Sequence, residues 1–175
     1  MPVRLFVAVR PPPEVVAALA ALPRPERPGL RWTPPEQWHV TLRFFGPVDA
    51  EQAEAALRGV AEAARAAPPA PARLGPEVGR FGRRVLHVPV AGLESLAAAV
   101  AARTAGVGRP PDPRPFTGHL TLARNRGSAS LATLTGAGVE ARWQVGEVAV
   151  MASVAQAAGT PNRYETVAAF PLTGA

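Results

Sequence analysis

Two parts of the chain repeat one order of elements: a helix, a loop rich in proline and arginine, and a strand that carries a histidine. The match is closest in H-V-T-L at 39–42 and H-L-T-L at 119–122, which lie 80 residues apart. Both phrases alternate polar and apolar residues, so each histidine shares a strand face with a threonine while the other two side chains face the core. The repeat predicts two equivalent lobes that face each other across a cleft.

The rest of the chain mixes helices and hairpins without a regular βαβ alternation. We therefore expect an α+β protein in which each lobe is an antiparallel sheet flanked by helices. The expected boundaries come from prolines, glycines and one N-cap residue, Asp49. Helices are expected at 11–22, 50–67 and 92–105, and strands at 4–9, 38–46, 72–80, 83–90, 116–124, 143–154 and 163–172.

Every basic residue is an arginine, because the 19 basic positions include no lysine, and the formal net charge is +6. Guanidinium groups bind phosphate in a bidentate manner, so this composition is compatible with a phosphate or nucleic-acid ligand. A GC-rich coding sequence would also favour arginine. The charge is therefore compatible with either origin.

The chain contains no cysteine, which excludes disulfides and thiolate chemistry. Its first residues lack the pattern of a signal peptide, and no apolar run is long enough to cross a membrane. We expect a cytoplasmic protein that does not enter the membrane, and we expect a monomer.

Two imidazoles facing one cleft suit a reaction that needs a general base and a general acid together. The ordinary histidine pKa of ~6.5 lets one ring be neutral while the other is protonated near neutral pH. The spacing alone does not decide which of His39 and His119 is the acid. Thr41 and Thr121 share the faces of these histidines and can hydrogen-bond a phosphoryl group held between them.

A single histidine on a strand is more often a half-buried structural residue, and we interpret His87 in L-H-V-P-V in this way. That explanation fits poorly when two of three histidines stand in the same phrase. The two H-x-T pairs could also hold a metal ion, but no third ligand is evident. We expect no metal and no cofactor.

At these residues the chain resembles the two-histidine phosphoesterases, and among them the LigT-like RNA 2′,3′-cyclic phosphodiesterases, also called 2′-5′ RNA ligases. The resemblance covers nearly the whole chain. It is carried, in this order, by R-L-F-V-A-V-R-P-P, R-W-T-P-P-E-Q-W-H-V-T-L-R-F-F-G, F-G-R-R-V-L, R-P-F-T-G-H-L-T-L-A-R and R-Y-E-T-V-A-A-F-P-L. One departure is Gly118, which stands where this family usually has a proline.

The resemblance implies one bilobal domain over residues 1–175 that needs no metal. It implies hydrolysis of 2′,3′-cyclic phosphates, at RNA ends or on nucleotides, to 2′-phosphomonoesters. His39 would then donate a proton to the ribose 3′ oxygen and His119 would accept one from water. Thr41 and Thr121 would hold the phosphate.

Two arginines are further candidates for contact with the phosphate. Arg43 has the same strand parity as His39 and could reach it. Arg124 matches an arginine that contacts the substrate phosphate in the family that the chain resembles. Its parity is opposite to that of His119, so it reaches the cleft only if the strand ends or bulges near Ala123.

Phe116 and Tyr164 are the aromatic residues that we expect to stack on a nucleobase. Two other functions remain open. The same groups could serve a ligase that joins 2′-phosphate and 5′-hydroxyl RNA ends, and the chain could instead bind RNA without turnover. The last alternative predicts steep salt dependence of binding and indifference to His39→Ala and His119→Ala.

Overall fold

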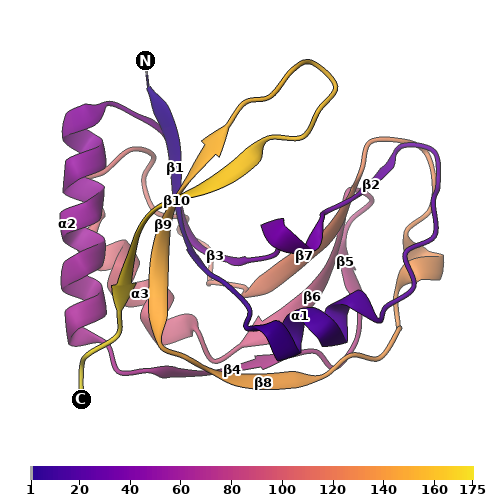
Figure 1. Ribbon diagram of the computed structural model, residues 1–175, viewed down its shortest axis with the longest axis horizontal. Coiled ribbons are helices and arrows are strands. Elements are labelled where there is room, and N and C mark those ends of the chain that lie inside the picture. Colours follow the sequence, from indigo (N-terminus) through magenta and orange to yellow (C-terminus); the bar gives the residue numbers. More distant parts are fainter. Residues whose placement is uncertain (1) are drawn as a thin grey trace.

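The structure is a computed structural model that describes residues 2–175, and it is built on a curled antiparallel sheet with three α-helices (Figure 1). The sheet has the order β10-β9-β1-β3-β7-β6-β4-β8, while β2 pairs with β7 and β5 pairs with β6. The strands are β1 (Val3–Val9), β2 (Leu30–Trp32), β3 (Val40–Val48), β4 (Ala70–Leu74), β5 (Gly79–Phe81), β6 (Val85–Ala91), β7 (His119–Asn125), β8 (Ala141–Val145), β9 (Glu147–Val154) and β10 (Arg163–Pro171). The helices are α1 (Pro13–Ala20), α2 (Ala50–Ala66) and α3 (Glu94–Arg103). The expected α+β class is confirmed.

The best-defined helix boundary is the start of α2. The Asp49 side chain accepts a hydrogen bond from the backbone N–H of Gln52, and the Gln52 side chain accepts one from the backbone N–H of Asp49. This reciprocal capping box satisfies two amide groups that the first helical turn leaves unpaired. The helix ends at Ala66, just before two prolines that cannot continue it. The expected N-cap is confirmed.

Two halves of the sheet correspond to the expected lobes. One half contains β10, β9, β1 and β3, and the other contains β7, β6, β4 and β8. All the pairings are antiparallel, and the halves join through a single residue pair between β3 and β7, Val40 opposite Leu120. The two histidine strands therefore cross at their first residues.

The structure divides two of the expected strands into two separate strands each. The segment 72–80 divides into β4 and β5, because the chain turns at Gly75, where φ is +108°. The segment 143–154 divides into β8 and β9 on either side of Gly146, and β8 pairs with β4 while β9 pairs with β1 and β10. The expected loop at 23–37 also contains the short strand β2.

The main core lies between the sheet and the helices. It includes Val7 of β1, Val40 of β3, Val60 of α2 and Val100 of α3, all of them fully buried. A second, smaller cluster on the opposite face of the sheet consists of Phe6, Ala8, Ala149 and Met151, with Tyr164 packed against it. None of the helices in residues 2–175 is long and apolar enough to cross a membrane.

Candidate active site

The two histidine phrases meet where β3 and β7 cross. Val40 and Leu120 are paired there, so His39 and Thr41 flank the crossing on one strand and His119 and Thr121 flank it on the other. We call these four residues the histidine crossing. The two rings are close enough for a charge on His119 to affect the pKa of His39. The structure therefore brings together the four residues on which the sequence-based hypothesis depends.

Both imidazoles are held in the same way. Nδ1 of His39 lies 2.7 Å from the carbonyl oxygen of Gln37, and Nδ1 of His119 lies 2.9 Å from that of Thr117. A carbonyl only accepts hydrogen bonds, so Nδ1 of each ring carries the hydrogen and Nε2 of the neutral ring keeps a free lone pair. In each lobe the carbonyl belongs to the residue two positions before the histidine.

Nε2 of His39 lies 3.0 Å from the hydroxyl oxygen of Thr41, which can donate to it. The pKa of His39 is lowered, first because burial disfavours the charged ring, and then because of the positive charges of Arg10, Arg124 and His119. The hydrogen bond to the Gln37 carbonyl acts in the opposite direction. His39 is therefore neutral near pH 7 in the unliganded protein.

Aromatic side chains flank both histidines. The rings of Phe6 and Tyr164 lie 5.1 and 5.2 Å from that of His39, and Tyr164 meets it edge-on. On the other lobe, Phe81 meets His119 edge-on at 4.8 Å and stacks on His87 at 4.0 Å. Sequence reasoning missed Phe81, which is 40% exposed. The only signal was its place at the turn of the F-G-R-R-V-L hairpin.

His87 is buried, as expected for a structural residue, but it also belongs to the wall of this site. It lies opposite Thr121 in the β6–β7 pairing, and its ring is 5.6 Å from that of His119. Burial and the charge of His119 both lower the pKa of His87. It therefore presents a neutral ring beside His119.

Arg124 reaches the site because β7 contains the bulge that its role requires. Thr121 pairs with His87 and Ala123 pairs with Leu86, so Leu122 has no partner on β6 and the strand parity changes there. Arg124 is exposed, and its charge acts on His39. It also lines a pocket of about 280 Å³ that includes Tyr164, which we call the Tyr164 pocket.

The expectation for Arg43 is wrong, and a bulge at the equivalent position is the reason. Thr41 pairs with Ala8 and Arg43 pairs with Val7, so Leu42 is skipped and Arg43 turns to the core side. It is only 5% exposed. Its guanidinium donates to the carbonyl oxygens of Phe44, Thr104, Val107 and Arg109, so it is a structural residue.

Comparison with known proteins agrees with this geometry. A family model described as the 2′-5′ RNA ligase superfamily matches residues 11–156. The chain belongs to this superfamily. Among solved structures, TT0787 of Thermus thermophilus is 29% identical, with a TM-score of 0.81 and 98% of each chain covered. LigT of E. coli is 26% identical in complexes with 3′-AMP and with NADP+, with TM-scores of 0.78 and 0.76 and 99% of each chain covered. No curated protein sequence matches the chain.

The LigT-like fold places the two aromatic candidates in different pockets. Tyr164 lies beside His39 and lines the Tyr164 pocket. Phe116 is half-buried and lines a pocket of about 500 Å³ next to the second histidine phrase. The four residues of the histidine crossing line neither pocket. No cluster of three or more His, Asp or Glu side chains suited to a metal ion occurs in residues 2–175.

Proposed function

We propose that the chain hydrolyses 2′,3′-cyclic phosphates, at RNA ends or on nucleotides, to 2′-phosphomonoesters. The observation that carries this proposal is the matched pair of imidazoles, each held through Nδ1, which leaves Nε2 as the nitrogen that can exchange protons; in the unliganded protein the Thr41 hydroxyl contacts Nε2 of His39. Membership of the superfamily and the 3′-AMP complex of E. coli LigT support a nucleotide substrate.

In the proposed reaction a water molecule attacks phosphorus while Nε2 of His119 accepts one of its protons. The bond between phosphorus and the ribose 3′ oxygen breaks, and Nε2 of His39 delivers a proton to that oxygen. The product is a 2′-phosphomonoester, and proton exchange with solvent returns both rings to their starting states. The division of roles between the two rings follows the family that the chain resembles.

His39 must carry a second proton before it can donate one, yet its pKa is lowered in the unliganded protein. The phosphate of the substrate brings a negative charge to the ring and offsets the positive charges of Arg10 and Arg124. Substrate binding thus raises the pKa of His39. His39 therefore takes up its second proton mainly when substrate is bound.

Thr41, Thr121 and Arg124 are the proposed ligands of the phosphate. The threonine hydroxyls lie on the same strand faces as the histidines, and Arg124 adds a positive charge that acts on His39. Such groups stabilise the charge that builds up on the non-bridging oxygens during the reaction. Phe81 and Tyr164 are the aromatic rings beside the crossing that can contact the sugar or base.

The test uses the four 2′,3′-cyclic nucleotides in EDTA, with identification of the monophosphate isomer. The wild type should release 2′-monophosphates. His39→Ala and His119→Ala should each lower kcat/KM by about 100-fold or more, because each removes a proton-transfer group. Their thermal melting should stay close to that of the wild type.

A substrate with sulfur in place of the 3′ oxygen separates the two roles, because a thiolate leaves without a proton donor. This substrate should restore turnover to His39→Ala and leave His119→Ala inactive. Wild-type rates in both alanine variants would refute the mechanism. Tight binding of RNA without turnover would favour the binding protein instead.

The description of the superfamily makes ligation a second candidate. A ligase would use the same four residues to join a 2′-phosphate to a 5′-hydroxyl. Cut RNA halves supplied in the same assay would then yield 2′-5′ junctions that disappear in His39→Ala and His119→Ala. Because water is in large excess, we expect hydrolysis to dominate.

A further inference from the structure

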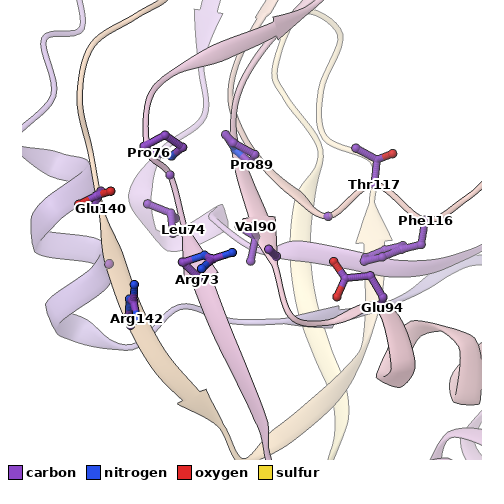
Figure 2. A pocket seen from close by; sticks show the side chains of 14 residues that line it. Arg73, Leu74, Pro76, Pro89, Val90, Glu94, Phe116, Thr117, Glu140 and Arg142 are labelled. Carbon is purple, nitrogen blue, oxygen red and sulfur yellow. The ribbon is translucent and has the colours of Figure 1, made fainter.

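A pocket of about 500 Å³ that contains Phe116 borders the second histidine phrase, and we call it the Arg73 pocket (Figure 2). Small or rigid residues of three neighbouring segments border it, namely Gly75, Pro89, Ala91 and Gly118. Figure 2 shows Glu140 and Arg142 on one side of the pocket and Phe116 and Glu94 on the other.

Strand register places this pocket on the same face of the sheet as His119. Residues paired directly across an antiparallel sheet point to the same face, and so do residues two apart on one strand. His119 is paired with Pro89, and Ala91 lies two positions further along β6. Ala91 is paired with Arg73. The pocket is therefore a lateral continuation of the active-site face.

Two arginines on neighbouring strands line the pocket. Arg73 of β4 is paired directly with Arg142 of β8, so their side chains share this face. Within residues 2–175 neither arginine forms an ion pair. Like charges at directly opposed positions destabilise a sheet, whereas an anion bound between them would stabilise it. The pair points to an anionic ligand.

The remaining side chains suit the rest of a nucleotide. Phe116 offers an aromatic ring on which a base can stack. The Glu94 carboxylate accepts a hydrogen bond from the backbone N–H of Gly92 and has oxygen lone pairs left for amino groups or ribose hydroxyls. Glu94 and Glu140 also offset the two arginines, so a ligand with one negative charge fits better than a polyanion.

We propose that the Arg73 pocket binds the nucleotide that precedes the terminal one in an RNA chain, with its phosphodiester on Arg73 and Arg142. This inference rests on the proposed function and narrows it, because it makes the 3′ end of a single-stranded RNA the preferred substrate over a free cyclic nucleotide.

The spacing suits one nucleotide step. Arg73 lies two strands away from His119 and two residues along, which is about 12 Å between backbones at the usual strand spacing and rise. An extended arginine side chain can bridge part of this interval, and the part that remains is about the length between successive phosphates of an RNA chain.

The test compares cyclic 2′,3′-AMP with a diadenylate that ends in a 2′,3′-cyclic phosphate. The wild type should prefer the diadenylate. Arg73→Gln combined with Arg142→Gln should lower kcat/KM for the diadenylate about tenfold or more, because two charge-assisted contacts are lost. The value for the mononucleotide should stay within about twofold, since the phosphate ligands at the crossing remain.

The matched control is Arg58→Gln combined with Arg65→Gln, which removes the same charge from exposed positions of α2. It should leave both substrates unaffected. Thermal melting should show all variants folded, because exposed arginines contribute little to stability. If the double variant loses activity equally on both substrates, or on neither, the Arg73 pocket does not bind RNA.

A binding measurement keeps this inference separate from the proposed function. A fluorescent triadenylate that ends in a 2′-phosphate cannot be hydrolysed as a cyclic ester, so its affinity is measurable whatever the enzyme does. The slope of log Kd against log salt should fall by about 0.7 in the Arg73 and Arg142 variant, because the variant no longer neutralises the one phosphate that the two arginines share. If the wild type hydrolyses no cyclic phosphate, the proposed function fails. The salt slope would still show whether the Arg73 pocket binds an RNA phosphate, because an unchanged slope in the variant would exclude it.

Discussion

At the scale of single residues, two arginines with similar positions in the repeated phrase have opposite roles. Arg43 follows the first H-V-T-L and Arg124 lies just beyond the second H-L-T-L. Alternation along the strand correctly puts each histidine with its threonine, because no bulge separates them. It fails beyond Leu42 and Leu122, where each strand bulges. A bulge depends on the neighbouring strand, so the sequence of one strand cannot reveal it.

The two arginines should therefore respond to mutation in opposite ways. Arg43→Gln leaves four buried or half-buried carbonyls without this donor, so the free energy of unfolding should fall by about 2–4 kcal/mol. Its kcat/KM should stay near that of the wild type below the melting range. Arg124→Gln should lower kcat/KM about tenfold by removing a phosphate contact, with little change in melting. Denaturant titration and kinetics of both variants check this, and the reverse pattern would contradict the assignment.

At the scale of elements, helices were easier to predict than strand boundaries. The N-cap and the two prolines define α2 locally, so its limits could be read from the sequence. The divisions between β4 and β5 and between β8 and β9 depend on which strands pair across the sheet, which is not local information. Gly118 shows the same dependence. A Cβ atom there would lie 2.1 Å from the carbonyl oxygen of Val90, so the close approach of β6 requires glycine.

Gly118→Ala should therefore strain the start of β7. The added methyl group meets backbone rather than a flexible side chain, and we expect a loss of about 1–3 kcal/mol in unfolding free energy. The shift also disturbs the Thr117 carbonyl that holds His119, so kcat/KM should fall as well. Gly106→Ala is the control, because a Cβ there has no heavy atom within 4 Å and φ is not positive. Equal melting temperatures for the two variants would show that β7 tolerates the methyl group.

At the scale of the whole molecule, the repeat correctly predicts two lobes that bring distant histidines together. What it could not predict is how each lobe surrounds its histidine. In one lobe Ala8 lies opposite Thr41, and in the other His87 lies opposite Thr121. The register of β6 against β7 places the third imidazole, that of His87, beside His119. The β5–β6 hairpin places Phe81 there. Both contacts arise from tertiary pairing of the strands.

Burial of two histidines in this arrangement also sets how stability depends on pH. The pKa values of His39 and His87 lie below their ordinary value of 6.5 in the folded protein, chiefly because burial disfavours the charged rings. The unfolded chain therefore binds more protons than the folded protein as pH falls through 6.5. Stability should be fully present above about pH 7.5 and should decline as pH falls below the unfolded value, until the folded rings are protonated as well. Thermal melting between pH 8 and pH 5 measures this decline.

His87→Phe keeps a ring against Phe81 and removes one titrating group, so its melting temperature should fall less steeply over the same range. A variant that follows the wild-type curve would show that His87 is not protonated on unfolding in this window.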